Sequence, residues 1–107
     1  MAREYPALHP DAARPMEIAR EVARLARSIV GKHAEVIWFG SWPRGQARPH
    51  SDIDVAISIG KPIALERMAL LDEAVDELPT LYDIDIMDLS STGPALREEI
   101  LKHGERL

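Results

Sequence analysis

Apolar residues recur along the chain with two different periods, and the change from one period to the other predicts the secondary structure. From Pro15 to Gly31 they return every three or four positions, which places them on one face of an amphipathic helix. A proline suits the first turn of a helix and a glycine the position after its end, so both boundaries agree with the pattern. The same spacing between Leu65 and Pro79 predicts a second helix.

Three other segments have the composition or the two-residue period of β-strands. The run 34–39 (AEVIWF) is rich in β-branched and aromatic residues and is apolar on both sides, as expected of a central strand. Residues 52–59 (DIDVAISI) alternate, with one apolar face, and residues 83–89 (DIDIMDL) begin with the same alternation. Residues 42–51 carry prolines and a glycine and predict turns or a short helix.

A last helix is predicted after the third strand. Ser91 or Thr92 can cap it, Pro94 falls near its first turn and Gly104 lies past its end. The order α, β, short α, β, α, β, α indicates an α/β (α+β) fold, and 107 residues suffice for one domain. We expect residues 1–14, which lack periodicity, to form a flexible arm and residues 15–107 to form the domain.

Composition and charge narrow the classes of function. Apolar residues make up 46% and charged residues 29%, the balance of a soluble globular protein. No apolar run is long enough to span a bilayer, and the N-terminus lacks a signal-peptide pattern, so we expect a cytoplasmic protein without a membrane partner. The net charge of −5 argues against extended binding of a nucleic-acid backbone. Without cysteine, a metal site must use oxygen or imidazole ligands.

The segment from Gly40 to Asp54 (GSWPRGQARPHSDID) contains the candidate chemistry. Asp52 and Asp54 are two residues apart at the start of a strand, so both carboxylates project to one face, with Cα atoms about 7 Å apart. A third acid on that face, Asp85 or Asp83, lies on a later strand that can pair beside them. Carboxylates about 4 Å apart repel each other by roughly 4 kcal/mol at an effective dielectric near 20, so a cation is expected there.

Carboxylate ligands suit Mg²⁺ or Mn²⁺, whose remaining positions are filled by water and by substrate phosphate. Two such ions would activate an attacking oxygen and stabilise the leaving oxygen in a displacement at phosphorus. Gly40 permits close approach of the backbone, the Ser41 hydroxyl can bond phosphate oxygens, and Arg44 offers a permanent positive charge to a triphosphate. The residues therefore predict phosphoryl or nucleotidyl transfer.

The motif Gly40-Ser41, ten intervening residues and Asp52-x-Asp54 resembles the signature of the polymerase-β-like nucleotidyltransferase superfamily. The string that extends through Ser51 is similar to its minimal nucleotidyltransferase (MNT) branch. This resemblance implies the polymerase-β-like nucleotidyltransferase fold, in which helices flank a mixed β-sheet of about three to four strands.

The resemblance also assigns roles to individual residues. Asp52, Asp54 and Asp85 would be both catalytic residues and ligands of two Mg²⁺ ions, with Asp85 helping to deprotonate the attacking hydroxyl. The nucleotide, ATP, would be bound by residues of the turn and its surroundings: Gly40, Ser41, Arg44 and Ser51.

Minimal members of this family commonly act as the antitoxin of a module with a small all-helical partner, the HEPT toxin. The resemblance implies a protein adenylyltransferase that places AMP on a tyrosine of that partner, in a homo- or hetero-oligomer. Two alternatives remain open. One is an antitoxin that neutralises its partner by binding alone, and the other is a nucleotidyltransferase for a small molecule, although such relatives carry an additional domain for the acceptor.

Two residues of the turn depart from the family pattern, which usually has a basic and a small residue there. Pro43 cannot donate an amide to phosphate, so nucleotide affinity can differ. Trp42 could stack on a base, but packing into the protein is at least as common for an aromatic residue in a turn. Because Asp83 and Asp88 sit at strand ends, we expect them to be structural or exposed.

Overall fold

The fold is described by a computed structural model that covers residues 12–107, so most of the expected arm lies outside the described residues. The first helix begins at residue 13, two residues before the expected domain boundary. The helices in this range all fall short of the length and apolar character that spanning a bilayer needs. In chain order the elements are α1 (Ala13–Ile29), β1 (Glu35–Phe39), β2 (Ile53–Ser58), α2 (Leu65–Asp76), β3 (Ile84–Asp88), the 3-10 turn η1 (Leu89–Ser91), α3 (Pro94–His103) and β4 (Glu105–Arg106).

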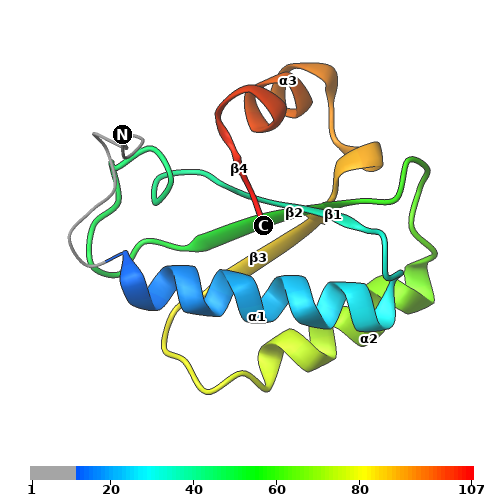
Figure 1. The fold of residues 1–107 in the computed structure, drawn as a ribbon, viewed down its shortest axis with the longest axis horizontal. Helices are drawn as coiled ribbons and strands as arrows, with labels where there is room; N and C mark the ends of the chain where they lie inside the picture. The colour runs from blue at the N-terminus through cyan, green and yellow to red at the C-terminus, as the bar shows by residue number, and fades with distance from the viewer. Residues whose placement is uncertain (1–11) are drawn as a thin grey trace.

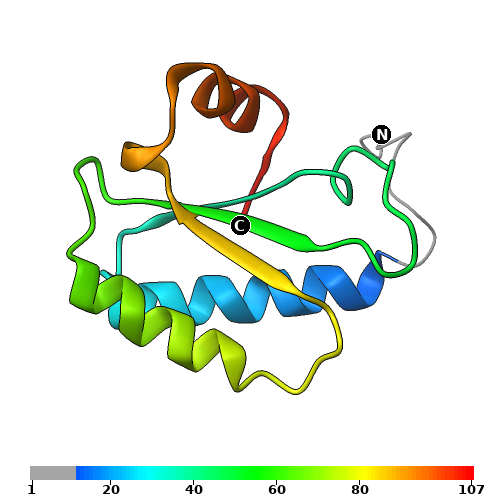
Figure 2. The same cartoon turned by 180° about the vertical axis from the view of Figure 1, so that it is seen from behind.

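The strands form one mixed sheet in the order β3-β2-β1-β4. Strand β1 is antiparallel to both β2 and β4, whereas β2 and β3 are parallel and are joined through α2. Helices α1 and α2 lie on one face of the sheet and α3 lies on the other, as the two opposite views show (Figures 1 and 2). The mixed α/β architecture expected from the family resemblance is confirmed.

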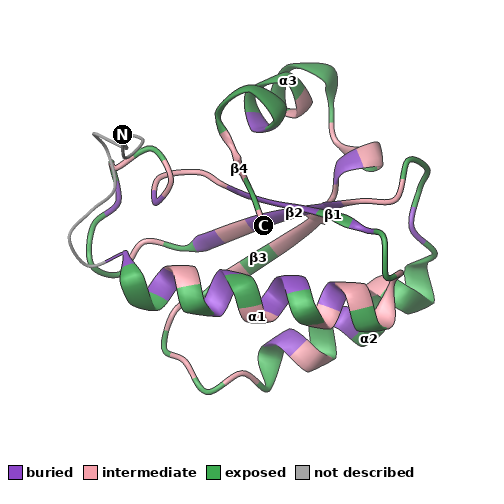
Figure 3. Cartoon of the chain, in the orientation of Figure 1, coloured by how far each residue is buried: buried purple, intermediate pink, exposed green. Residues whose placement is uncertain are grey.

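The two faces of the sheet bury separate clusters of side chains. Alternation along β2 sends Val55 toward α1 and α2 and Ala56 toward α3, and both are fully buried. The inner face of α1 is buried along its length (Figure 3). We had expected a single apolar face on β2, but Ala56 packs with Ile37 and Ile100 beneath α3. Full burial of each Val or Ile side chain contributes about 1.5–3 kcal/mol, so both layers hold the strands in place.

Of the two structures expected for residues 42–51, turns or a short helix, the turns are confirmed, because backbone bonds close at Gly45 and Gln46 instead of continuing with helical spacing. The expectation that Ser91 or Thr92 caps the last helix was wrong. Gly93 precedes the first turn of α3, and no side chain caps it. The Thr92 hydroxyl instead donates to the Asp88 carbonyl at 3.1 Å. Strand β4 was not expected, since its two residues are too few to show a period.

Candidate active site

One end of the sheet brings together residues from three strands. Phe39, the last residue of β1, pairs with Asp54 of β2, so Gly40 and Ser41 leave the sheet beside the start of β2. Asp54 pairs in turn with Asp85 on the parallel strand β3. The expectation that a later strand places an acid beside Asp54 is confirmed, and that acid is Asp85. Two carboxylates 31 positions apart in the chain, 54 and 85, become neighbours through the register of the sheet.

The surroundings of Asp54 raise its pKa to about 6. Burial is the largest cause, because removal of a carboxylate from water disfavours its charged form. The negative charges of Asp85 and Asp52 act in the same direction, and a hydrogen bond with the Asp85 carboxyl adds to the effect. A cation bound at these carboxylates would favour their charged forms and reverse the shift.

The atoms around Asp54 fit a divalent cation chemically, since carboxylate oxygens are the ligands that Mg²⁺ and Mn²⁺ prefer. Asp85 is exposed and Asp54 is half-buried, so the pair is open to ligands from solvent. Within residues 12–107, no three His, Cys, Asp or Glu side chains lie close enough to hold a metal ion together. Asp52 lies directly before the first residue of β2 and is exposed. Its position is therefore not fixed by the backbone hydrogen bonds of the sheet.

Gly40 makes room for the Asp54 side chain. Its φ is +84°, in the left-handed region that favours glycine. A Cβ atom at this position would overlap the Asp54 carboxylate oxygen Oδ2. The chain can therefore leave β1 beside the acid pair only with glycine here, which gives the Gly-Ser motif a steric reason.

The turn that follows Gly40 is anchored through Trp42. The amide of Gln46 donates to the Ser41 carbonyl at 2.9 Å and closes the turn. The Trp42 ring is fully buried and meets the Tyr82 ring edge-on, with centroids 6.0 Å apart at 84°. Its Nε1 donates to the Ser51 carbonyl at 2.9 Å. The packing role of Trp42 is confirmed, and sequence reasoning missed that it joins the Gly-Ser turn to the residue before Asp52.

The residues expected to bind the nucleotide differ in the hydrogen bonds and ion pairs that they already form. The Ser41 hydroxyl has no hydrogen-bond partner within residues 12–107 and lies next to Gly40. The Ser51 hydroxyl accepts a hydrogen bond from the Arg48 amide at 2.8 Å. It can still donate its own proton to a phosphate oxygen. Arg44 forms an ion pair with Glu99 of α3 at 2.8 Å, a contact that no sequence pattern predicts.

Asp88, the last residue of β3, and Asp83, the residue before its start, are structural or exposed, as predicted. The Asp88 carboxylate accepts from the amides of Ile63 and Ser90, at 2.8 and 3.0 Å. It therefore fastens the loop before α2 to the end of β3. Asp83 is exposed, and its backbone carbonyl accepts from the Ile53 amide at 2.9 Å.

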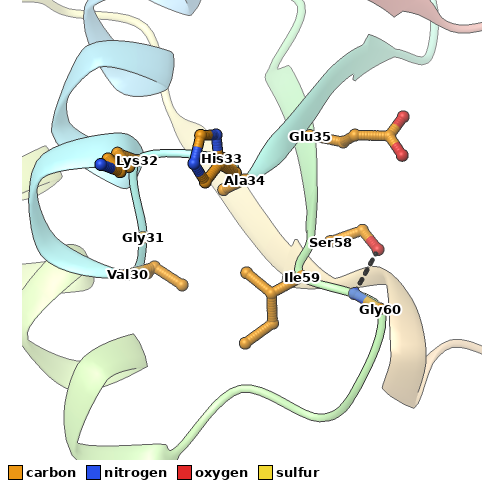
Figure 4. Close-up of a pocket in the computed structure, with 9 residues that line it drawn as sticks. All are labelled: Val30, Gly31, Lys32, His33, Ala34, Glu35, Ser58, Ile59 and Gly60. Atoms are coloured by element: carbon orange, nitrogen blue, oxygen red, sulfur yellow. Dashed lines mark hydrogen bonds between the residues drawn. The ribbon is translucent and has the colours of Figure 1, made fainter.

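A cavity of about 510 Å³ lies at the other end of the sheet (Figure 4). Lys32 and His33 of the loop after α1 line it together with Glu35 and Ser58. Glu35 pairs with Arg106 at 3.2 Å, and no second carboxylate stands beside it. The residues that line this cavity include neither a pair of acids nor a Gly-Ser turn. We therefore place the candidate active site at the opposite end of the sheet.

The sequence pattern of the polymerase beta nucleotidyltransferase family matches residues 26–107 of this chain. The chain belongs to this family. The match covers all four strands and the whole candidate site, and members of the family use a nucleoside triphosphate and a divalent metal ion. The expected fold and the expected family are thereby confirmed.

Two curated proteins that are similar to this chain are named as protein adenylyltransferases. The chain is 34% identical over 67 residues to the probable protein adenylyltransferase MntA of Haemophilus influenzae, covering 62% of this chain and 59% of that protein. It is 26% identical over 88 residues to the protein adenylyltransferase MntA of Shewanella oneidensis, covering 81% of this chain and 62% of the relative. The matched parts thus span about 60% of the length of these relatives.

A crystal structure of a toxin–antitoxin with AMP-PNP contains a chain with the same fold. The TM-score is 0.62 with 25% sequence identity, over 82% of this chain and 70% of the other.

Proposed function

We propose that this chain is a Mg²⁺-dependent nucleotidyltransferase that transfers AMP from ATP to a hydroxyl group. The observation that carries the proposal is the Asp54–Asp85 pair beside Gly40-Ser41, at the end of a sheet of the polymerase beta nucleotidyltransferase family. Asp54 has a raised pKa beside another acid, which is typical of carboxylates that share a cation or a proton.

The proposed reaction is a displacement at the α-phosphorus of ATP. The acceptor oxygen forms a bond to this phosphorus, the bond to the bridging oxygen of the β-phosphate breaks, and pyrophosphate leaves. Asp85 accepts the proton of the acceptor hydroxyl. Asp52, Asp54 and Asp85 would hold two Mg²⁺ ions, with Mn²⁺ as a substitute. The bound ions would supply positive charge that stabilises the phosphate oxygens in the transition state.

The triphosphate is proposed to lie along the turn after β1. There Gly40 allows close approach, and the Ser41 hydroxyl, which has no partner within residues 12–107, can donate to a phosphate oxygen. Arg44 supplies positive charge, and the Ser51 hydroxyl can still donate one hydrogen bond while it accepts from Arg48. Trp42 would help by holding this turn at a constant distance from Asp52.

The similar proteins suggest the acceptor. Both curated relatives are protein adenylyltransferases, and the structural relative is part of a toxin–antitoxin complex. We therefore propose that the acceptor is a tyrosine hydroxyl of a small helical HEPT-type toxin, and that the chain acts as an antitoxin in a hetero-oligomer. Because ATP is the donor, we place the reaction in the cytoplasm.

A transfer assay tests this proposal. The chain is incubated with ATP labelled at the α-phosphate, Mg²⁺ and a small helical HEPT-type toxin as the partner. We expect label on the partner with the wild type and with Asp72→Asn, an exposed acid on α2, but not with Asp54→Asn. Equal labelling by Asp54→Asn and Asp72→Asn would show that the acid pair is not the catalytic site.

One observation favours a binding module as a second candidate. The described acids do not form a compact group of three, so the chain could neutralise its partner through contact alone. Growth of cells that express the toxin separates the two functions. Rescue by the double variant Asp52→Asn, Asp54→Asn equal to rescue by the wild type supports binding alone, whereas loss of rescue supports the enzyme.

A further inference from the structure

An ion pair joins the turn after β1 to helix α3. Arg44 Nη1 donates to Glu99 Oε1 at 2.8 Å, between residues 55 positions apart in the chain. Arg44 lies in the turn that follows Gly40-Ser41, and Glu99 lies in the middle of α3. The contact therefore connects the proposed triphosphate site with an element that contributes none of the proposed ligands.

We propose that Glu99 is a positioning residue that orients Arg44 toward the triphosphate of the bound nucleotide. This inference rests on the proposed function. Glu99 would act through Arg44 and would not touch the nucleotide itself.

Helix α3 is well placed to serve as a fixed support. The Arg97 guanidinium donates to three carbonyl oxygens of η1 and the residue after it, which ties the helix to the turn that directly follows the strand carrying Asp85. Ile100 of the same helix is buried against the sheet, where it packs with Ile37 and Ala56. An arginine held by Glu99 is thereby held relative to Asp85. The three carbonyls belong to Leu89, Ser90 and Thr92, at 3.3, 3.2 and 3.0 Å.

The geometry of the bond leaves Arg44 able to bind phosphate. A guanidinium has five N–H donors on three nitrogens, and the bond to Glu99 uses Nη1 alone. Nε and Nη2 of Arg44 have no partner within residues 12–107, so they can donate to phosphate oxygens while Glu99 stays in place. Ordering a long side chain before the ligand arrives reduces the entropy that binding would otherwise lose.

Glu99 also has an opposing effect, since its negative charge repels the triphosphate. Its side chain is 49% exposed and that of Arg44 is 42% exposed, so water and salt screen this repulsion. Ordering of Arg44 acts locally through a short bond and is screened less. We therefore expect loss of Glu99 to weaken nucleotide binding.

Calorimetric titration of ATP with Mg²⁺ tests the inference without an acceptor protein. We expect Glu99→Gln to raise the dissociation constant by between about threefold and tenfold. The matched control is Glu98→Gln, since Glu98 is the exposed neighbour on α3 whose side chain has no partner in the described chain. Glu98→Gln should bind as the wild type does, and Glu99→Asp, which keeps the charge, should recover part of the loss.

A double-mutant cycle shows whether Glu99 acts through Arg44. In an Arg44→Ala background, Glu99→Gln should change the dissociation constant by less than about twofold, because the residue it orients is gone. An equal effect in both backgrounds, tighter binding by Glu99→Gln, or the same constants for Glu98→Gln and Glu99→Gln would each overturn the inference. If the wild type itself fails to bind ATP, the proposed function falls first and takes the inference with it.

Discussion

Gly40 and Asp54 fit together so closely that a methyl group on Gly40 would overlap the Asp54 carboxylate oxygen. The contact follows from the register of β1 and β2, which pairs the residue before Gly40 with Asp54. The same register that forms the sheet thus sets the Gly-Ser turn against the acid pair. Geometry at this end of the sheet is determined by backbone pairing more than by side-chain packing.

Replacement of Gly40 by alanine should therefore damage both stability and function. We expect a loss of about 1–3 kcal/mol, from the unfavourable positive φ and from the displaced carboxylate. Gly60→Ala is a matched control, because Gly60 has a φ of +79° but open space around its missing Cβ. Thermal unfolding and ATP binding of both variants separate the two causes. Equal losses of ATP binding in the two variants would contradict the steric account.

Replacement of Asp54 by asparagine should remove activity and at the same time stabilise the metal-free protein. Turnover should decrease by at least about a hundredfold, since one strong electrostatic contribution to the transition state is lost. At pH 7 without metal, the free energy of unfolding should increase by about 1 kcal/mol, allowing for solvent screening of this half-exposed carboxylate. Steady-state kinetics and chemical denaturation measure the two effects. A variant that is both less stable and fully active would be incompatible with this site.

The stability difference between the wild type and Asp54→Asn should depend on pH. The pKa of Asp54 rises from 3.8 to about 6 in the folded chain, so between these values the folded state binds more protons than the unfolded state. Its contribution to stability is therefore complete below about pH 4, is lost as the pH rises to about 6, and is constant above that. Melting curves of both proteins without metal check this. A difference that is the same at pH 4 and pH 7 would show that Asp54 has an ordinary pKa.

The hydrogen bond of Trp42 should matter for nucleotide binding. Trp42→Phe keeps an aromatic ring in the core but loses the bond to the Ser51 carbonyl, which should cost about 1 kcal/mol and loosen the turn. Trp38→Phe is the control, because Trp38 is equally buried and its Nε1 has no partner within residues 12–107. We expect weaker ATP binding by calorimetry only for Trp42→Phe. Identical affinities of the two variants would show that the bond does not position the turn.

Much of the fold could be predicted because its signals are local. The alternation that begins at Asp52 identified β2 and placed Asp54 on the face that meets Asp85, since a strand has a fixed two-residue period. The Gly-Ser and Asp-x-Asp spacing predicts which residues form the site, and the sheet register places Gly40 beside Asp54. The roles assigned to these residues remain predictions.

What escaped prediction depends on contacts between distant parts of the chain. Strand β4 has only two residues and forms because α3 returns the chain to the free edge of β1. The pairing of Arg44 with Glu99 spans 55 positions, and no pattern in the sequence announces it. The anchoring of Trp42 depends on a carbonyl acceptor, a group that every residue carries and that a sequence cannot single out.

Binding of Mn²⁺ in the presence of ATP, followed by electron paramagnetic resonance of the free ion, tests the central claim most directly. The account predicts saturable binding by the wild type and by Asp72→Asn, and its loss in Asp54→Asn and Asp85→Asn. Mn²⁺ binding that is the same in all four proteins would contradict the claim that the neighbouring acids of β2 and β3 hold a divalent cation against a triphosphate.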